Sequence, residues 1–393
     1  MPGAAEMRIG LLIDSLVGGG AERMALNFAE KFRDLGHEAH LFILRNDIQH
    51  DAGDIPVHIV TETDQLVAWR PLNKWLLAQA LRRAVARVEA GSGPFDFFIS
   101  NAEDMDRLSR MAGLPWVLIR YRNSLREYIA AKVGTTTGLK RRVRSWRWTR
   151  KFRGIYGGRH IVAISKEMAR ELTEDCGIRP ASMTTIYNPF NFERIRALAD
   201  EPAPDLPNEP YIIYVARFCA RKDQETLLRA YVQAGVTQPL VLLGGTTSPH
   251  EEAYKAHIER LIGELGLTGK VIIPGFRTNP YPWIKHAALF AMSSRSEGLP
   301  LVLVEALVLG VPVVSTDCPT GPDEILVGEF ARFLSPVGDP AALAANIRQA
   351  LLAYPASDDS LIAKFSDDVA IDHYLTHFAT LSGKEPSPAA HRS

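Results

Sequence analysis

The sequence predicts an α/β protein built from two doubly wound parallel-sheet domains. The chain has 393 residues, which is too long for a single ordinary hydrophobic core and indicates two domains. Short apolar runs alternate with amphipathic segments from end to end, and this alternation is typical of strand–helix units. Most of these runs are apolar throughout rather than alternating with polar residues, which indicates parallel strands covered by helices on both faces.

The apolar runs are the candidate strands. Those of the first half are 8–15, 38–44, 55–60, 95–100, 115–122, 160–165 and 183–188, and those of the second half are 211–217, 239–245, 270–276, 289–294, 312–318 and 331–336. Helices are expected between them. One over 21–36 should stop at Gly36, and another should begin with Asp223 as its N-cap and stop at Gly235.

The composition changes at 199–210, where Pro, Asp and Glu dominate and no periodicity survives. We interpret this stretch as a linker between an N-terminal domain over 1–190 and a C-terminal domain over 205–365. A final helix is predicted over 366–381, with the option of crossing back to the N-terminal domain, and 382–393 is expected to be a flexible tail.

The bulk composition excludes several classes of protein. Lys+Arg and Asp+Glu both total 45, and a chain without net positive charge is not expected to bind nucleic acid. The three cysteines form no CxxC pair or Cys/His cluster, so they predict reduced thiols and no metal site. The first residues lack the basic region of a signal peptide, and no window approaches the about 18–20 apolar residues of a membrane span. We therefore expect a cytoplasmic protein, either free or peripheral on the inner face of the membrane.

The segment 293–326, SSRSEGLPLVLVEALVLGVPVVSTDCPTGPDEIL, is the strongest candidate for a binding site. It begins where a predicted strand ends, and ligands of open α/β sheets bind beyond the carboxyl ends of strands. Free N–H groups at a helix start attract phosphate. Gly298 would let a ligand approach closely, and Pro300 suits the first helical position.

Two carboxylates frame this turn, Glu297 in the loop and Glu305 in the helix. Helical side chains lean toward the N-terminus, so Glu305 could reach the ligand that Glu297 touches. A carboxylate accepts two hydroxyl hydrogen bonds, which suits a ribose diol or a sugar ring. A pair of acids at this spacing also fits a solvated helix start, but the surrounding segment favours binding.

The motif SRSEGLPLVLVEAL, followed by PVVSTDCPTGPDEIL, resembles the donor-site signature of the retaining GT-B glycosyltransferases of family 4. The resemblance extends through GGGAER, AISKEMARELTEDCGI, IYNPF, VARFCARKD and NPYPWIKHAALFAMSSRSEGLP, so it covers nearly the whole chain. It implies a GT-B fold, in which two Rossmann-like domains face a central cleft. It also implies that the segment Gly298, Leu299 and Pro300 binds the donor, that Glu297 contacts the transferred sugar and that Glu305 binds the nucleotide ribose.

The same resemblance implies that Arg217 and Lys222 hold the donor pyrophosphate. Their positions agree, because Arg217 ends a predicted strand and Lys222 lies at the start of the next helix. Two fixed cations can stabilise the charge of a diphosphate leaving group. We therefore expect Glu297, Arg217 and Lys222 to be catalytic, with no metal and no other cofactor. The alternative for the two cations is a pair on the surface.

The Gly-rich turn SLVGGGAER (15–23) only partly matches a dinucleotide-binding fingerprint, because Arg23 stands at the third Gly position. This argues against a nicotinamide-dependent oxidoreductase. The turn resembles the N-terminal Gly-rich loop of the family, where Gly19 and Gly20 could let sugar or phosphate approach. A plain tight turn is the alternative.

Two further features of the first half concern the acceptor side and a metal. At 121–124 (YRNS) many family members carry His before Asn, whereas this chain has Arg122 before Asn123. Both are candidates for acceptor or sugar contacts, and Arg122 could meet an acidic sugar or an acceptor phosphate. Asp104 and Asp106 form a D-x-D triplet, which holds a metal in the other large glycosyltransferase fold class. Here we interpret it as an acidic helix start.

The stretch 138–160 is dense in Lys and Arg, contains no acid and carries interleaved aromatic residues such as Trp146 and Trp148. Basic residues attract anionic lipids, and Trp favours the membrane interface. The stretch therefore predicts contact with an anionic membrane surface. The alternatives are a solvated helix face with the two Trp in the core, or binding of single-stranded RNA.

These patterns together predict a retaining glycosyltransferase. Its donor would be a nucleoside-diphosphate sugar, and the resemblance to the family implies that the nucleotide is uridine. Its acceptor would be a hydroxyl of a saccharide or lipid-linked saccharide in the biosynthesis of cell-surface polysaccharide, lipopolysaccharide included. The alternatives from other classes are a non-catalytic two-domain binding protein of the clam-shell type and a nicotinamide-dependent oxidoreductase.

Overall fold

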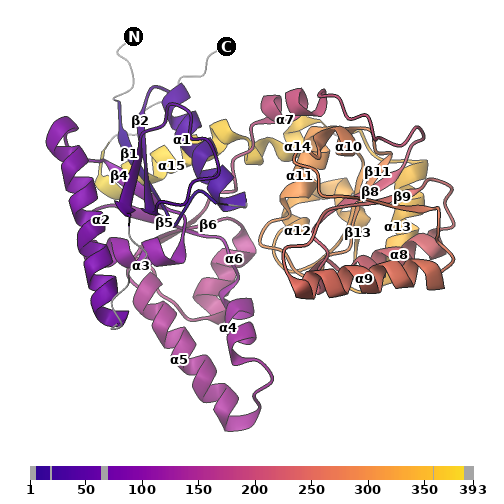
Figure 1. The fold of residues 1–393 in the computed structure, drawn as a ribbon, viewed down its shortest axis with the longest axis horizontal. Helices are drawn as coiled ribbons and strands as arrows, with labels where there is room; N and C mark the ends of the chain where they lie inside the picture. Colours follow the sequence, from indigo (N-terminus) through magenta and orange to yellow (C-terminus); the bar gives the residue numbers. More distant parts are fainter. Residues whose placement is uncertain (1–5, 18–19, 63–69, 357, 385–393) are drawn as a thin grey trace. The chain divides into compact units, whose positions relative to one another are not determined.

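The computed structural model describes residues 6–17, 20–62, 70–356 and 358–384 (Figure 1). Gly19 and most of the predicted tail at 382–393 lie outside these ranges. The chain divides into two compact units, one made of residues 1–189 and 367–393 and the other of residues 190–366.

The first unit contains a seven-stranded sheet in which every pair is parallel, in the order β3-β2-β1-β4-β5-β6-β7. The inner strands are almost fully buried, whereas the edge strands β3 and β7 are half-buried, which explains the solidly apolar runs. The strands are β1 (Arg8–Ile13), β2 (Glu38–Arg45), β3 (Val57–Thr61), β4 (Phe97–Ser100), β5 (Val117–Tyr121), β6 (His160–Ala163) and β7 (Ser182–Thr185).

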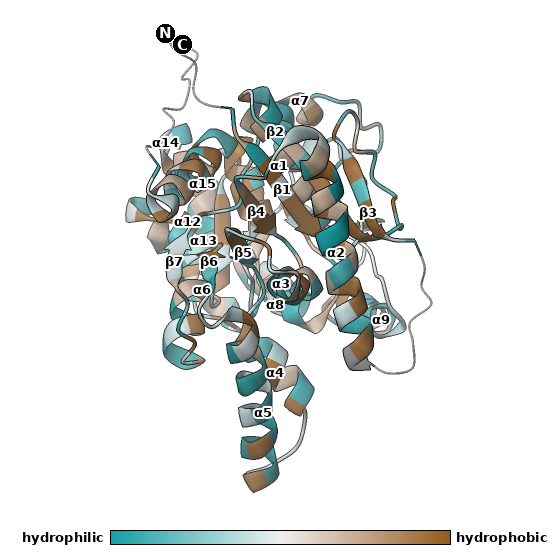
Figure 2. Cartoon of the chain, turned by 90° about the vertical axis from the view of Figure 1, so that its left-hand side faces the viewer, coloured by the Kyte–Doolittle hydropathy of each residue, from teal (hydrophilic) through white to brown (hydrophobic). Residues whose placement is uncertain are grey.

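Helices connect these strands. They are α1 (Gly20–Asp34), α2 (Arg70–Ser92), α3 (Glu103–Ala112), α4 (Leu125–Val133), α5 (Gly138–Tyr156) and α6 (Lys166–Arg170), which continues as the π-helical turn η1 (Glu171–Asp175). Helix α5 extends away from the sheet of its unit and is anchored at its C-terminal end by the buried Phe152, Ile155 and Tyr156 (Figures 1 and 2).

The last helix, α15 (Asp367–Ser382), belongs to the first unit. Its buried Tyr374 and Phe378 join the core that β1 and α1 form, and the Tyr374 ring lies 5.2 Å from that of Phe28. Lys31 of α1 pairs with Asp368 at 2.6 Å. The crossing back to the N-terminal domain, which the sequence left open, is therefore present.

The second unit contains a six-stranded parallel sheet in the order β10-β9-β8-β11-β12-β13. Its strands are β8 (Ile212–Val215), β9 (Leu240–Leu243), β10 (Val271–Gly275), β11 (Leu289–Met292), β12 (Val313–Thr316) and β13 (Leu334–Ser335). Its helices and short helical turns are α7 (Phe192–Ala199), η2 (Ala220–Lys222), α8 (Gln224–Ala234), α9 (Pro249–Glu264), α10 (Tyr281–Lys285), α11 (Leu301–Val308), α12 (Pro322–Ile325), η3 (Gly328–Phe333), α13 (Pro340–Leu352), α14 (Asp359–Ile362) and η4 (Ala363–Phe365).

The predicted fold class is confirmed, and every predicted strand overlaps an observed one. The helix signals also hold. Asp223 caps α8, and Gly36 and Gly235 follow their helices with φ of 84° and 61°.

The placement of the linker at 199–210 is wrong. This irregular stretch lies inside the second unit, and the chain passes between the units at 189–190 and 366–367. The reason is that α7, which precedes the stretch, packs within the second unit, where Asn279 Nδ2 donates to the carbonyl of Leu198 at 2.8 Å. A stretch without periodicity looks the same in sequence whether it joins domains or elements of one domain.

Candidate functional site

The candidate donor site of the second unit lies at the carboxyl ends of β8 and β11. These strands are neighbours in the sheet, and β8 is followed along the chain by β9 on its other side. The strand order therefore reverses between β8 and β11, which is where open α/β sheets bind ligands. Arg217 lies two residues after the end of β8, and Ser294 and Glu297 follow β11.

Lys222 and Glu297 form a mostly buried ion pair at this point. The Lys222 Nζ lies 2.6 Å from Glu297 Oε1, and the side chains are 16% and 7% exposed. The Ser294 hydroxyl donates to the same Oε1 at 2.5 Å and itself lies 2.7 Å from the hydroxyl of Tyr214. Glu297 Oε2 has no hydrogen-bond partner among the described residues. The structure thus brings two of the predicted catalytic residues together and leaves one carboxylate oxygen for a ligand.

The turn that carries Lys222 is held by the ends of both strands. The Tyr214 hydroxyl from β8 donates to the Lys222 carbonyl at 3.0 Å, and the Ser293 hydroxyl after β11 donates to it at 3.1 Å. The next residue, Asp223, has φ of 48° and caps α8. Its left-handed backbone reverses the chain so that the Lys222 ammonium points back toward the end of β11.

The loop that carries Glu297 rests on the turn after β12. The Thr320 hydroxyl donates to the Glu297 carbonyl. Gly321, with φ of 115°, lies so close to the loop that a Cβ there would be 2.8 Å from Pro300 Cδ and 3.0 Å from Leu299 Cδ1. The side chains of Leu299 and Pro300 are buried and pack against this turn, so they help to hold the loop in place.

Gly298 lies in this loop between the buried Glu297 and Leu299, and the close approach of a ligand to it stays a prediction. The prediction for Pro300 was wrong by one position, because Pro300 is the N-cap and α11 begins at Leu301. Sequence reasoning missed Gly321. Its signal is a Gly a few residues after a strand, which is difficult to distinguish from any other turn.

Arg217 has different partners from Lys222. Its guanidinium lies 2.9 Å from Glu251 and 3.2 Å from the Thr247 hydroxyl, and its side chain is 51% exposed. No contact among the described residues joins it to Lys222 or Glu297. Gly244, which follows β9, lets the segment after β8 pass close by, since a Cβ there would be 1.9 Å from the Ala216 carbonyl oxygen. Arg217 therefore stands at the same strand edge but is held toward the start of α9.

Glu305 lies in α11 and is half-buried. The Tyr281 hydroxyl donates to its Oε1 at 3.1 Å, a contact between α10 and α11 that the sequence did not indicate. A ribose would share this carboxylate with Tyr281.

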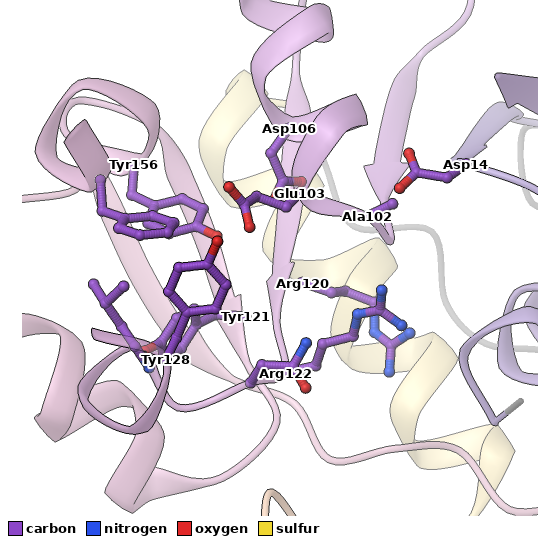
Figure 3. Close-up of a pocket in the computed structure, with 12 residues that line it drawn as sticks. Asp14, Ala102, Glu103, Asp106, Arg120, Tyr121, Arg122, Tyr128 and Tyr156 are labelled. Carbon is purple, nitrogen blue, oxygen red and sulfur yellow. The ribbon is translucent and has the colours of Figure 1, made fainter. Parts of the chain in front are cut away.

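In the first unit, Arg122 and Asn123 line a cavity of about 220 Å³ (Figure 3). Asp14 and Asp106 line it too, which sequence reasoning did not predict. The remaining lining residues are Ala102, Glu103, Arg120, Tyr121, Leu125, Tyr128, Phe152 and Tyr156. Gly20 is the first residue of α1, and no described contact tests its predicted role.

The D-x-D triplet does not act as one group. Asp104 is exposed in the first turn of α3 and lies 4.0 Å from Arg107. Asp106 is buried, accepts a hydrogen bond from the Ser100 hydroxyl at 2.5 Å, and has its pKa raised by burial to about 7. The interpretation as an acidic helix start thus describes Asp104 but misses the place of Asp106 in the cavity. Within the described ranges, no group of three or more His, Cys, Asp and Glu side chains is arranged to hold a metal.

The basic stretch forms helix α5, and its two tryptophans lie outside the core. Trp146 is 56% exposed, and the half-buried Trp148 has its ring centroid 5.7 Å from that of Tyr128. The alternative with both Trp in the core is therefore wrong. Of the eight Lys and Arg residues in 140–153, Lys151 is the one with an ion pair to another described residue, Glu103. No described helix is both long and apolar enough to span a bilayer.

Two family models match the chain in tandem. Residues 199–363 match the family described as glycosyl transferases group 1, and residues 18–194 match the one described as glycosyltransferase family 4. The first match covers the candidate donor site, and the second covers the residues that line the cavity of the first unit except Asp14.

Curated relatives and a solved structure are similar to this chain. An uncharacterised glycosyltransferase of Methanocaldococcus jannaschii is 33% identical over 188 residues, which are 46% of this chain and only 45% of that protein. A Campylobacter jejuni enzyme, named N-acetylgalactosamine-N,N'-diacetylbacillosaminyl-diphospho-undecaprenol 4-alpha-N-acetylgalactosaminyltransferase, is 26% identical over 81% of this chain and 83% of its own. The structure of Anabaena HepE with UDP and glucose matches 96% of this chain and 100% of its own, with 22% identity and a TM-score of 0.66, and so shares the fold.

Proposed function

We propose that this chain, which has the GT-B fold, is a glycosyltransferase that transfers a sugar from a uridine-diphosphate sugar to a hydroxyl of a saccharide with retention at the anomeric carbon. The observation that carries this proposal is the buried pair of Lys222 and Glu297 at the carboxyl ends of β8 and β11. Such a pair provides one fixed cation and one hydrogen-bond acceptor where an open sheet binds its ligand.

In this proposal Lys222 stabilises the diphosphate leaving group. Negative charge grows on the phosphate as the bond to the sugar breaks, and a preorganised cation in a water-poor site stabilises that charge without reorganisation. Arg217, whose guanidinium is half-exposed, adds a second cation at the same strand edge. Two protein cations replace a divalent metal in this scheme.

Glu297 and Glu305 bind donor hydroxyls in this proposal. The unpartnered Oε2 of Glu297 accepts a hydrogen bond from the transferred sugar. Its Oε1 is occupied by Lys222 and Ser294, which suits a positioning role better than that of a covalent nucleophile. Glu305 accepts from the ribose together with its neighbour Tyr281.

Retention then follows from transfer on one face of the sugar. The bond between the anomeric carbon and the diphosphate oxygen breaks, and the acceptor oxygen forms its bond on the same face. The acceptor proton passes to an oxygen of the leaving phosphate, which becomes the protonated nucleotide product. No protein side chain is consumed, so the cycle closes with release of UDP and of the glycosylated acceptor.

The acceptor class we propose is a saccharide or lipid-linked saccharide of cell-surface polysaccharide, such as lipopolysaccharide. The name of the Campylobacter relative places its own acceptor on diphospho-undecaprenol, a lipid carrier. An acceptor of this kind suits an enzyme that acts in the cytoplasm at the inner face of the membrane.

Helix α5 supplies the membrane contact in this proposal. Leu139, Val143 and Trp146 are 77%, 48% and 56% exposed, and their spacing places them on one face. Exposed apolar side chains flanked by cations that form no ion pair with another described residue fit an anionic bilayer surface, where each Lys or Arg contributes about 1 kcal/mol. We expect binding to phosphatidylglycerol vesicles that weakens as salt rises, because the Debye length is ~8 Å at 0.15 M.

Vesicle sedimentation tests the membrane contact. Arg142→Ala/Arg147→Ala should pellet less with anionic vesicles, while the matched control Arg82→Ala/Arg83→Ala on the exposed face of α2 should pellet like the wild type. Equal pelleting of the wild type with phosphatidylcholine and phosphatidylglycerol vesicles at low salt would contradict the contact and leave the donor site untouched.

A panel of sugar nucleotides tests the proposed function. We expect the purified protein to release UDP from at least one UDP-sugar, slowly with water and faster with acceptor extracts. Binding of sugar nucleotides without release would favour the clam-shell binding protein, and oxidation of a nicotinamide cofactor would favour an oxidoreductase. Release of GDP alone would refute the uridine assignment.

A further inference from the structure

The first unit has a second pocket, which lies at the opposite strand ends from the cavity of Figure 3. It is lined by Arg153 and Gly157 at the end of α5, Gly177 after η1, and Arg179. These segments lead into β6 and β7, so the pocket lies at the amino ends of strands, whereas Arg122 in the cavity follows the carboxyl end of β5. Its volume of about 400 Å³ falls within the about 300–1,000 Å³ of small-molecule sites. We call it the arginine pocket.

Two chain segments bring the guanidinium groups of this pocket together. Arg153 lies in the last turn of α5. The Gly158 N–H donates to the carbonyl of Arg179 at 2.9 Å, which ties the segment before β7 to the end of α5. Gly177, with φ of 58°, leaves room for Arg153, because a Cβ there would be 3.0 Å from the Arg153 Nη2. Both arginines therefore reach the same pocket from different elements.

The two guanidinium groups have few partners in the protein. Both side chains are exposed. Arg153 donates to the carbonyl of Cys176 at 3.5 Å, which is long for a hydrogen bond. The Arg179 side chain makes no hydrogen bond or ion pair with another described residue. The carbonyls at helix C-termini attract cations, which explains Arg153 beside the end of η1, but Arg179 makes no such contact.

Arg110 adds a third positive charge at the rim of the pocket. It is exposed, and its guanidinium donates to the carbonyls of Gly154 and Gly157 at 2.8 and 3.2 Å. Its charge is felt by the neighbouring Arg159, whose pKa is lowered by burial, raised by Asp106 and lowered further by Arg110. Like charges held close together raise the free energy of the folded protein, and a bound anion would offset this cost.

The nearby acids do not neutralise the pocket. No Asp or Glu stands among the described residues that line it. The acids closest along the chain are the three in η1, and each of them has a partner elsewhere. These contacts are Glu171 with the Tyr121 hydroxyl at 2.7 Å, Glu174 with Arg170 at 3.7 Å and Asp175 with Arg126 at 3.5 Å. The pocket therefore keeps its positive charge, and its ligand should be an anion.

A phosphate group fits the pocket better than a carboxylate does. The fork of one guanidinium satisfies both oxygens of a carboxylate, so a carboxylate needs only one arginine. A phosphate presents oxygens in several directions and carries up to about two negative charges. It can therefore accept from Arg153 and Arg179 together, although they approach from different elements. The volume also leaves room for a substituent or a second phosphate.

We propose that the arginine pocket binds a phosphate group, as a phosphomonoester or a diphosphate, at a site separate from the candidate donor site. Arg153 and Arg179 donate to its oxygens, and Arg110 adds positive charge at the rim. The phosphate belongs either to a soluble compound or to a lipid headgroup, and both present the same chemistry to the two arginines. This inference goes beyond the proposed function and does not depend on it.

Titration calorimetry of the full chain with inorganic pyrophosphate tests the binding of a soluble phosphate. UDP is present in excess so that the candidate donor site is occupied. Arg179→Gln removes a charge but no contact among the described residues, and it should weaken pyrophosphate binding by about tenfold or more. Arg179→Lys should retain part of the affinity, because it keeps the charge and loses only the fork. Arg82→Gln, which removes an exposed arginine of α2, is the matched control and should bind like the wild type.

Vesicle sedimentation tests the lipid headgroup as the source. The vesicles contain phosphatidic acid, whose headgroup is a phosphomonoester, or phosphatidylglycerol, whose phosphate is a diester, at equal total charge. For a headgroup ligand, Arg179→Gln should pellet less than Arg82→Gln with phosphatidic acid, and the difference should be smaller with phosphatidylglycerol. A deficit of Arg179→Gln in calorimetry alone indicates a soluble phosphate, and a deficit that includes sedimentation indicates a lipid headgroup.

The same variants separate this inference from the proposed function. Release of UDP from a sugar nucleotide should be equal in Arg179→Gln and the wild type, because Arg179 lies in the first unit and the candidate donor residues lie in the second. A protein that binds pyrophosphate through Arg179 but releases no UDP would refute the proposed function and leave the arginine pocket standing. If Arg179→Gln and Arg82→Gln behave alike in both binding assays, the arginine pocket is overturned, whatever the release of UDP.

Discussion

Gly321→Ala should damage the donor loop although it changes no residue that touches the donor. The new methyl carbon would lie 2.8 Å from Pro300 Cδ, 3.0 Å from Leu299 Cδ1 and 3.3 Å from Leu299 Cα. Non-bonded carbon atoms pack at about 3.5–4.0 Å, so the segment 297–300 has to move away. The φ of 115° at this position also strains any residue that carries a Cβ.

The two effects can be sized separately. A non-Gly residue in a sparsely populated backbone region costs about 1–3 kcal/mol. An extra methyl group in a packed site costs about 1–3 kcal/mol more. For a total near 3 kcal/mol we expect the melting temperature of this variant to fall by about 6–12 °C. Because the displaced loop carries Glu297, affinity for a UDP-sugar should fall as well, whereas a purely global loss of stability would leave it unchanged at low temperature.

Gly328→Ala is the matched control. Gly328 also has a positive φ, of 61°, but a Cβ there would meet nothing within 4 Å. It therefore carries the milder strain of the left-handed region without the clash. Differential scanning calorimetry measures the melting temperature, and titration with a UDP-sugar at 10 °C measures the affinity. If Gly321→Ala is no worse than Gly328→Ala in either measurement, the contact of Gly321 with Leu299 and Pro300 does not fix the loop.

The remaining predictions concern single side chains and metal. Glu305→Ala should weaken UDP binding by about 1–3 kcal/mol in calorimetry, and unchanged affinity would remove Glu305 from the site. Lys222→Ala should lower kcat by about 10²-fold or more, whereas a rise in KM alone would indicate a positional role. Turnover should survive EDTA, and loss of activity that Mn²⁺ restores would contradict the metal-free mechanism. Asp106→Asn should reduce the pH dependence of stability. Burial raises the pKa of Asp106 from 3.8 to about 7, so between these values the folded protein keeps a proton that the unfolded chain releases. The free energy of unfolding of the wild type should therefore fall by up to about 4 kcal/mol as the pH rises from about 4 to 7. Equal melting curves of wild type and variant at pH 5 and pH 8 would contradict this.

Local patterns determined the elements and the donor motif. Strands such as Leu289–Met292 are apolar throughout because helices cover both faces, and that burial leaves the same mark in any sequence that fills the position. Glu297 could be placed after a strand and before a helix because strand, turn and helix signals all lie within one short segment. From the sequence, Glu297 and Lys222 could be placed only at the same edge of the sheet. The 2.6 Å contact between the Lys222 ammonium and the Glu297 carboxylate was visible only in the structure.

Contacts between distant segments were decided by the tertiary structure alone. The cavity brings Asp14 together with Arg122 and Tyr156, which lie more than a hundred positions further along the chain, and no local pattern marks a residue by what packs against it. The return of α15 to the first unit depends on Tyr374 and Phe378 finding the core around β1, although an amphipathic helix suits either unit. The amino-acid sequence by itself therefore determined which segments are strands and helices and where the candidate donor motif lies, because those properties depend on neighbours along the chain. Which helix covers which sheet, and which side chains share a cavity, depended on packing between surfaces that meet only after the chain has folded.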